Sequence, residues 1–257
     1  MLTEMFIIAW REFKNNYSKI IPVFFKLTTP AITMLLFTMI FASSTTHIVF
    51  NGFRIRYIEY LIPGLMCVLT SSMVHVGHQS ILADKQTGIT SIIITSGVSM
   101  KIYIITRMIS NTIFEIIRLS ILLGISMFLL KTNYIFGIHN LTMFFLTITL
   151  LILFWYATGV LIAIFIKIQI LKDLILGFAM MLVPIVSPAY FDITKTPHWL
   201  QVASNYNPIT FGCRVARNSL FNSNFSLLSA DLFVLFALAM MGFLFMLVFS
   251  EKLSTLI

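Results

Sequence analysis

The chain has 257 residues, of which 59% are hydrophobic and only 10% charged, and its mean hydropathy is +0.98. A soluble domain carries about a quarter charged residues, so this composition excludes a water-soluble globule and predicts an integral membrane protein. The net charge of +8 comes from Lys and Arg scattered at the ends of apolar runs, and this spacing argues against a nucleic-acid-binding protein.

Residues 1–19 are predicted to form an amphipathic helix in the membrane interface. Apolar side chains, including Phe6, Trp10 and Phe13, recur at steps of three and four residues, and Arg11 belongs to the polar side. Aromatic residues opposite basic ones are typical of a helix that lies on a membrane surface; the alternative is a frayed soluble tail. No cleavable signal peptide is visible, so we expect the first span to remain in the mature protein.

Six apolar stretches follow, and each is interpreted as a membrane span. At about 1.5 Å per residue, about 20 helical residues cross the hydrocarbon layer of roughly 30 Å. The fourth stretch carries no charge and is the clearest, whereas the fifth is short and interrupted by Pro184 and Pro188. The expected spans are residues 20–42, 60–82, 108–130, 141–166, 174–189 and 232–249.

The charge balance predicts the orientation of these spans. An even number of spans places both termini on one side, where ten Lys and Arg fall in the connecting segments, against six on the other side. The positive-inside rule therefore predicts cytoplasmic termini. No internal repeat or linker is apparent, so residues 1–257 are expected to form a single all-α transmembrane domain.

The segment between the second and third spans is longer and more patterned than a passive connection needs. Thr87-Gly88 and Ser96-Gly97 are predicted to break the helix twice, leaving a short amphipathic piece between them. On the cytoplasmic side this piece would be presented to a soluble partner; the alternative is a passive loop. The residues expected to take part are Asp84, Lys85, Gln86, Thr87, Gly88, Thr95, Ser96 and Gly97.

The segment between the fifth and sixth spans, residues 190–230, does not look like an ordinary outer loop. An apolar patch around Trp199 is followed by a break at Asn207-Pro208, and a helical pattern then resumes and includes Arg217. Irregular backbone at membrane depth needs protein cover. We therefore expect one or two short helices that dip into the outer leaflet, or lie on it, as a lid.

Two places in the spans are candidates for a translocation path. Glu115 and Arg118 lie three residues apart in the third span, and hence on one helical face. Such charges are costly at mid-bilayer, and they either line a path or form a local ion pair that makes insertion possible. Glu59 and Tyr60 lie at the outer mouth of the second span. Pro63-Gly64, just inside, is expected to bend that helix, for the path or simply for packing.

Histidine and cysteine suggest no further chemistry. His75 and His78 share a face of the second span, and we interpret them as hydrogen-bonded interior residues, because a metal site or proton relay would need further ligands. The two cysteines, Cys67 and Cys213, are too few for a disulfide framework. No Walker A loop, H-E-x-x-H motif or G-x-S-x-G elbow is present, so we expect a chain that is not an enzyme and has no nucleotide site of its own.

Several short motifs together resemble the ABC-2 type permeases, the six-span membrane subunits of bacterial ABC exporters. The likeness covers nearly the whole chain. The motifs are, in chain order, Trp10-Arg11-Glu12, Pro30-Ala31-Ile32-Thr33-Met34, Tyr60-Leu61-Ile62-Pro63-Gly64, Lys85-Gln86-Thr87-Gly88 with Thr95-Ser96-Gly97-Val98-Ser99, Thr196-Pro197-His198-Trp199-Leu200-Gln201, Asn205-Tyr206-Asn207-Pro208-Ile209-Thr210 and Arg217.

The resemblance implies partners and a mechanism. Two permease copies would pair in the plasma (inner) membrane, each docked to a separate ATPase subunit that binds ATP and Mg, while this chain holds no cofactor. Residues 84–99 would supply the coupling helix seated in a groove of that ATPase, and the N-terminal helix would contact it too. Closure of the ATPases on ATP would pull these helices and open the path outward.

Substrate and coupling are less defined by the resemblance. The motifs look closer to those of exporters of drugs and small amphiphiles than to those of polysaccharide or lipid-linked glycan exporters, but fold-level likeness names no ligand. The alternative function is a proton- or ion-coupled secondary transporter that uses Glu115 and Arg118 with His75 and His78. That class usually contains inverted repeats, which are not found here.

Overall fold

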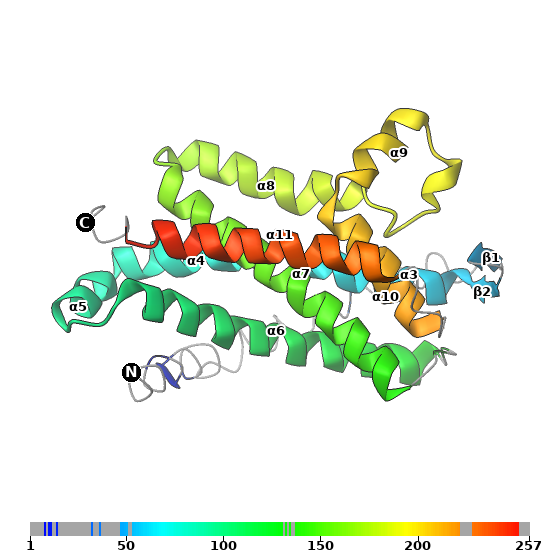
Figure 1. Ribbon diagram of the computed structural model, residues 1–257, viewed down its shortest axis with the longest axis horizontal. Coiled ribbons are helices and arrows are strands. Elements are labelled where there is room, and N and C mark those ends of the chain that lie inside the picture. The colour runs from blue at the N-terminus through cyan, green and yellow to red at the C-terminus, as the bar shows by residue number, and fades with distance from the viewer. Residues whose placement is uncertain are drawn as a thin grey trace.

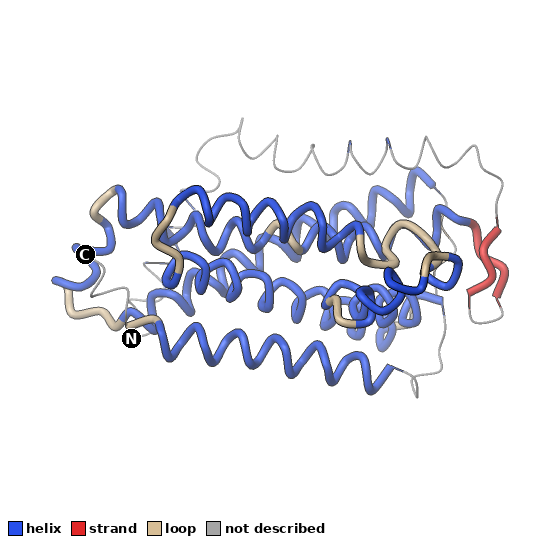
Figure 2. The backbone as a smooth tube through the Cα atoms, turned by 90° about the horizontal axis from the view of Figure 1, so that it is seen from above, coloured by secondary structure: helices blue, strands red, loops and turns tan. Residues whose placement is uncertain are grey.

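A computed structural model of the chain describes residues 47–50, 53–130, 137–221 and 228–251, together with the single positions 8, 10, 11, 14, 32, 36, 132 and 134. Long helices run roughly side by side and form an elongated bundle (Figures 1 and 2). A short helix lies at one end of the bundle and a β-hairpin at the other. We call these the α5 end and the hairpin end.

The bundle is built from helices of very different lengths. The two strands are β1, His47–Phe50, and β2, Phe53–Arg56, which pair antiparallel with His47 opposite Arg56. The helices are α3 Tyr57–Thr70, α4 Met73–Gln86, α5 Ile89–Thr95, α6 Met100–Leu130, α7 Ile138–Phe165, α8 Gln169–Ile185, the 3-10 turn η1 Ile193–Lys195, α9 His198–Asn205, α10 Pro208–Phe221 and α11 Leu228–Phe249.

Four helical segments in the described part of the chain are long and apolar enough to cross a membrane: Tyr57–Gln86, Met100–Phe128, Ile138–Phe165 and Ala230–Phe249. They correspond to the second, third, fourth and sixth expected spans, and the chain is a membrane protein. The expected fifth span overlaps the shorter α8. The expected first span, residues 20–42, lies outside the described residues except for Ile32 and Leu36, which are helical and exposed.

One boundary of the predicted architecture was wrong. The third span begins at Met100 and not at Met108, since Arg107 is paired inside the bundle and does not end the helix. The chain is predominantly helical, as expected, and has in addition a hairpin, β1 and β2, before α3. Helix α3 continues through Pro63 and Gly64, so the bend expected there stays a prediction. The second span has an interruption that was not predicted, at Ser71 and Ser72, whose hydroxyls donate to the Val68 and Leu69 carbonyls.

Helix α7 is the centre of the bundle and packs on α4, α10 and α11. Its approach to α4 is close enough to require glycine on both sides. A Cβ at Gly159 would overlap the Val74 carbonyl, and one at Gly77 would overlap the Tyr156 carbonyl. Small residues that let helix backbones meet in this way are typical of packing in membranes. The backbones of α4 and α7 are therefore in direct contact at this crossing.

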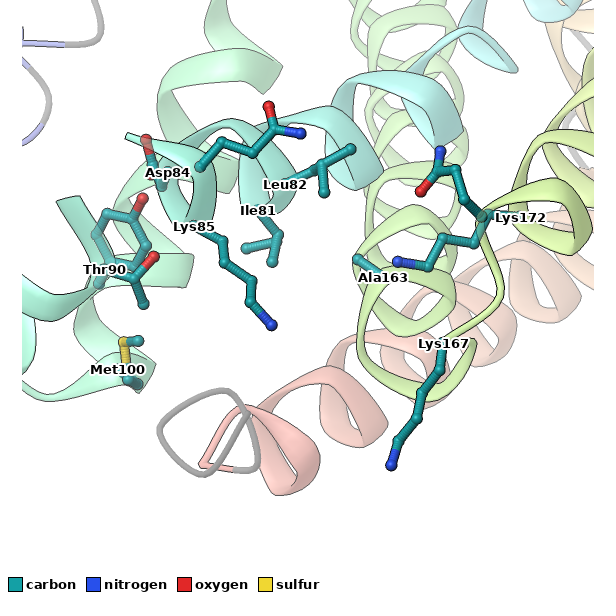
Figure 3. A pocket seen from close by; sticks show the side chains of 12 residues that line it. Ile81, Leu82, Asp84, Lys85, Thr90, Met100, Ala163, Lys167 and Lys172 are labelled. Atoms are coloured by element: carbon teal, nitrogen blue, oxygen red, sulfur yellow. The ribbon is translucent and has the colours of Figure 1, made fainter. Parts of the chain in front are cut away.

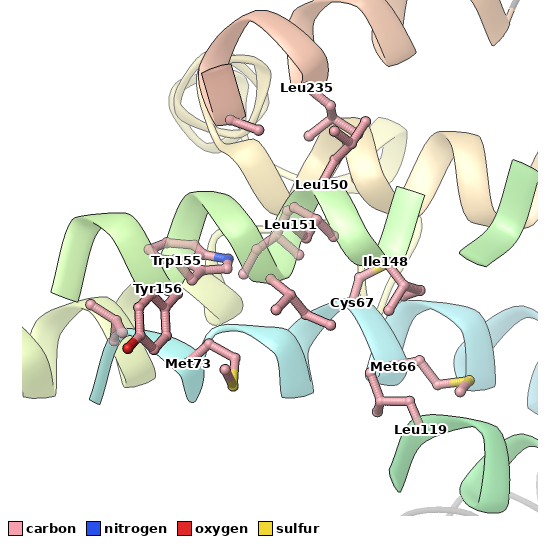
Figure 4. Close-up of a cluster of buried hydrophobic side chains, with 14 of the residues drawn as sticks. Met66, Cys67, Met73, Leu119, Ile148, Leu150, Leu151, Trp155, Tyr156 and Leu235 are labelled. Carbon is pink, nitrogen blue, oxygen red and sulfur yellow. The ribbon is translucent and has the colours of Figure 1, made fainter. Parts of the chain in front are cut away.

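Buried side chains fill the space around α7. Figure 4 shows Met73 of α4 beside Tyr156 of α7, Cys67 of α3 beside Ile148 of α7, and Met66 of α3 beside Leu119 of α6. The outer faces are apolar as well: α6 exposes an isoleucine every fourth residue from Ile109 to Ile121, and α11 exposes phenylalanine and methionine. Such faces suit contact with lipid or with another membrane subunit.

Candidate functional site

Helix α5 occupies the segment for which a short helix was predicted between two glycine breaks. Gly88 and Gly97 both have the left-handed backbone conformation, with φ of 72° and 77°, so the chain turns sharply before and after the helix. Thr90 and Ile93 face the bundle, while Ile92 is 65% exposed. The described part of the chain thus leaves an apolar side chain uncovered at this end.

Asp84 is placed differently from its prediction as a loop residue. It lies in α4, together with Lys85 and Gln86, and is buried. Its carboxylate pairs with Arg107 of α6 and lies 3.6 Å from the Arg11 guanidinium. Arg107 also donates to the Ser80 carbonyl at 2.6 Å. The carboxylate is therefore used inside the protein, whereas Lys85, Gln86 and Thr87 are exposed, and that they meet a partner together with α5 stays a prediction.

The predicted N-terminal helix is visible only in part. Trp10 is exposed and helical, and the guanidinium of Arg11 lies 5.9 Å from the centre of the Tyr103 ring, on α6. Phe6 and Phe13 lie outside the described residues. An exposed Trp beside an Arg that reaches into the bundle fits a helix on the surface of the α5 end.

A cavity of about 450 Å³ opens beside this charge cluster. Its lining comes from α4, α5, α6, the end of α7 and the start of α8. Lys85 and Lys172 extend into it from opposite walls, and Lys167 lies at its edge (Figure 3). Burial lowers the pKa of the Lys172 ammonium, and the positive charge of Lys85 lowers it further. The cavity is a place where positive charge accumulates.

At the hairpin end, three segments far apart in sequence meet at Arg217 of α10. This side chain is 2% exposed. Its guanidinium donates to the Tyr60 and Ala189 carbonyls at 2.9 Å each and lies 3.5 Å from the centre of the Tyr60 ring. A Cβ at Gly64 would lie 2.6 Å from the same guanidinium. Gly64 is therefore the space in which Arg217 fits, and the Tyr60-to-Gly64 motif serves that contact.

The Asn207-Pro208 break lies between α9 and α10, and the Asn207 side chain links α10 to α8. Asn207 accepts from the Ile209 backbone N–H at 2.9 Å and donates to the Val183 carbonyl at 2.6 Å, while Pro208 is the first residue of α10. Asparagine before proline is a favourable helix start, because proline lacks the N–H that would have no acceptor there. One side chain thus begins one helix and satisfies the end of another.

Only part of the expected outer lid lies on the surface. Helix α9 exposes Trp199 and Val202, and Tyr206 directly after it is exposed as well, which suits the membrane interface. Helix α10 does not lie on the surface: it is packed among α3, α7 and α11. The helical pattern predicted after Asn207-Pro208 corresponds to α10, and whether that helix dips into the outer leaflet stays a prediction.

Comparison with known protein families identifies the family of this chain. A family model described as the ABC-2 type transporter matches residues 3–221. The chain belongs to the ABC-2 type transporter family. The match runs from the N-terminal segment through Arg217, and the last span, α11, follows it. No curated protein matches the chain.

Family membership supports a transport permease. ABC-2 permease domains are membrane components and not catalytic ones, and they generally work with an ABC ATPase subunit. In this permease, no group of three His, Cys, Asp or Glu side chains is arranged to hold a metal ion within the described residues.

The charged pair of the third span is engaged within the permease. Arg118 pairs with Glu115 on the same helix and approaches the Ser72 hydroxyl at 3.4 Å, where the second span is interrupted. Glu59, expected at a path mouth, accepts from the Arg56 backbone N–H at 3.2 Å and from the Arg56 guanidinium at 2.6 Å, at the start of α3. Whether these residues line a path stays a prediction.

The two histidines of the permease do not act as a pair. His75 is exposed on α4 whereas His78 is buried, and neither ring nitrogen of His78 has a hydrogen-bond partner among the described residues. The expectation that both are hydrogen-bonded interior residues was therefore wrong. The two free cysteines, Cys67 on α3 and Cys213 on α10, are both buried.

The sequence reasoning missed several residues that matter at the α5 end. Arg107 was counted as a flanking charge, and Tyr103, Lys167 and Lys172 were given no role. The available signal was weak: Asp84 and Arg107 lie 23 residues apart, and nothing in their spacing shows that α4 and α6 bring them together. Lys172, in the first turn of α8 and just before an apolar run, resembles the charged flank of any membrane helix.

Proposed function

We propose that this chain is the permease subunit of an ATP-driven ABC-2 exporter in the plasma (inner) membrane, with both termini cytoplasmic. Two copies would pair, and each would dock a separate ATPase subunit that binds ATP and Mg. The cargo would be an amphiphilic small molecule, a drug, or a lipid-like or glycan substrate, moved outward. The observation that carries this proposal is α5, with its glycine borders and its exposed Ile92, in a chain of this family.

The packing supports a route for mechanical force. Within the described residues α5 packs chiefly on α4, and the Gly88 turn lets it change angle without unwinding that helix. Helix α4 meets α7 at the Gly77–Gly159 crossing and is tied to α6 through Asp84 and Arg107. A pull on α5 by a closing ATPase would move α4, and both neighbouring spans would follow.

The test is reconstitution of the purified chain with and without the ATPase subunit that copurifies with it. We expect ATP-dependent efflux of a fluorescent amphiphile only with both subunits present. Ile92→Asp should lower that rate by about tenfold or more, because a charge in an apolar contact at a groove costs more than 1.4 kcal/mol. Tyr206→Asp, at the 83% exposed Tyr206 of the other end, is the matched control. Efflux driven by an ion gradient through the chain alone would overturn the proposal.

No specific observation favours the secondary-transporter alternative. Its four charged or titratable candidates do not gather: Glu115 and Arg118 pair with one another on α6, while His75 and His78 on α4 differ in exposure. A proton relay needs groups within hydrogen-bond reach of one another.

A further inference from the structure

The cavity at the α5 end has two kinds of lining. Ile81, Leu82, Met100 and Ala163 supply apolar surface, and Lys85, Lys167 and Lys172 supply positive charge. Lys85 comes from α4, whereas Lys167 lies in the turn between α7 and α8 and Lys172 on α8. The fold therefore brings Lys85 close to two lysines that are far from it in the sequence. A volume of about 450 Å³ is sufficient for a small-molecule headgroup.

The most buried lysine of this cavity, Lys172, lacks an ion pair within the described residues. Asp84 is the acidic residue of the cavity lining, and its carboxylate already pairs with Arg107 and approaches Arg11. Lys172 is only 9% exposed, and no acidic side chain forms an ion pair with it in the part of the chain that the structure describes. The neighbouring Asp173 accepts from Gln169 at 3.0 Å on the exposed side of α8. The negative charge of Asp173 offsets only part of the cost of burying the Lys172 ammonium, because the pKa of Lys172 is still lowered.

The start of α8 adds to the attraction for anions. This 17-residue helix begins at Gln169, which lines the cavity together with Lys172 in the following turn. The first N–H groups of a helix have no acceptor within it, and the helix dipole is positive at that end. Ile170 and Leu174, next along α8, are exposed apolar residues on the bundle surface. Positive charge and an exposed apolar helix therefore lie side by side.

We propose that this cavity binds a phosphate-type anion, with Lys172 as its central ligand and Lys85 and Lys167 at its rim. The anion is either free phosphate or the headgroup of an acidic phospholipid whose acyl chains lie along α8. Basic pockets between membrane helices are suited to such headgroups. An anion bound in the cavity would link Lys85 of α4 to Lys172 of α8, close to α5. The binding site does not depend on which ATPase docks there, so it can fail without the proposed function failing.

The test uses the full-length chain purified in a neutral detergent without ATPase. Binding of a short-chain phosphatidylglycerol is measured by native mass spectrometry and by thermal shift, with phosphatidylcholine of the same chain length as the uncharged comparison. Inorganic phosphate is added as competitor. The variants are Lys172→Gln, Lys167→Gln and the charge-conserving Lys172→Arg. Lys195→Gln, at the exposed Lys195 of the hairpin end, is the matched loss of one positive charge.

We expect phosphatidylglycerol to bind more tightly than phosphatidylcholine. Lys172→Gln should weaken that binding by about tenfold, the loss of one charge-assisted hydrogen bond, and Lys172→Arg should restore it. Lys167→Gln should weaken it less, and Lys195→Gln should not change it. If millimolar phosphate displaces phosphatidylglycerol, free phosphate is a sufficient ligand. If the lipid stays bound, the site requires the headgroup together with its acyl chains. Either result supports the site.

Two results would overturn the inference. Equal binding of the charged and neutral lipids would show that the cavity has no preference for an anion. Equal losses in Lys172→Gln and Lys195→Gln would show that the attraction comes from the overall positive charge of the protein. The Lys172→Arg variant guards against misfolding, because it keeps the charge and the length of the side chain while replacing the same residue.

Discussion

The two ends of the bundle are held together in different ways. At the hairpin end, the buried cation Arg217 is bound by two backbone carbonyls and a tyrosine ring, and no acidic partner is needed. At the α5 end, Asp84 and Arg107 hold α4 to α6 by charge, next to a cavity lined by lysines. Backbone acceptors cannot be rearranged without moving the chain, whereas ion pairs can exchange partners. We therefore expect the hairpin end to act as an anchor and the α5 end to be the part that moves.

The largest effect is expected from removing the anchor. Arg217→Met should lower the free energy of unfolding by about 4 kcal/mol, since two buried carbonyls each lose their donor at roughly 1–3 kcal/mol apiece. Arg217→Lys should recover part of this, because one ammonium cannot reproduce the fork geometry of the guanidinium. Thermal unfolding in detergent measures both. A loss below about 1 kcal/mol for Arg217→Met would show that the cluster is not an anchor.

A smaller loss of unfolding free energy is expected at the α5 end. Asp84→Asn leaves Arg107 buried without its counter-charge and should destabilise by about 3 kcal/mol. The double variant Asp84→Asn with Arg107→Met should be less destabilised than the sum of the two single variants, because the pair acts as a unit. Additive losses, measured by the same unfolding assay, would mean that the two side chains do not depend on each other.

Adding one methyl group at a glycine tests how closely the helices pack at the hairpin end. Gly64→Ala places a Cβ 2.5 Å from the Ala189 carbonyl and should cost about 2 kcal/mol through overpacking. Gly124→Ala is the control on α6, where nothing lies within 4 Å of the added atom, and it should be neutral or slightly stabilising. Equal melting temperatures for the two variants would contradict the close fit around Arg217.

The smallest stability effect is expected at the α5 hinge. Gly88→Ala must adopt a φ of 72° and should cost about 1 kcal/mol, while the open space around it adds no steric penalty. If the hinge matters for coupling, the loss of ATP-driven transport will exceed what this destabilisation explains. Gly88→Asn, which tolerates the left-handed conformation better, should retain more transport than Gly88→Ala. Unchanged transport in both variants would make the turn a passive connector.

Hydrophobic period and length were enough to predict the long helices. The charge-free fourth span is α7, and the apolar runs around Cys67 and in α11 lie where they were expected. The glycine borders of α5 were also visible, because Gly88 and Gly97 have a left-handed backbone conformation that most other residues adopt only at a cost. These features depend on local sequence alone.

The sites depend on contacts between distant segments, and these could not be predicted. Arg217 looked like an outer-loop charge because its acceptors, the Tyr60 and Ala189 carbonyls, have no side-chain signature. Asp84 looked like a loop residue because its partner Arg107 belongs to another helix. Lys172 looked like an ordinary helix flank, and only the fold shows that it faces Lys85 across a cavity.

The central claim is that a soluble ATPase contacts the permease at α5 and not at the opposite end. A photo-crosslinking residue placed at Ile92 tests it directly, with the same residue at Val202 of α9 as the control, since both positions are exposed. We expect a crosslink from Ile92 to a protein that contains a Walker A loop, strengthened by ATP, and none from Val202. Crosslinking from Val202 but not from Ile92 would contradict it.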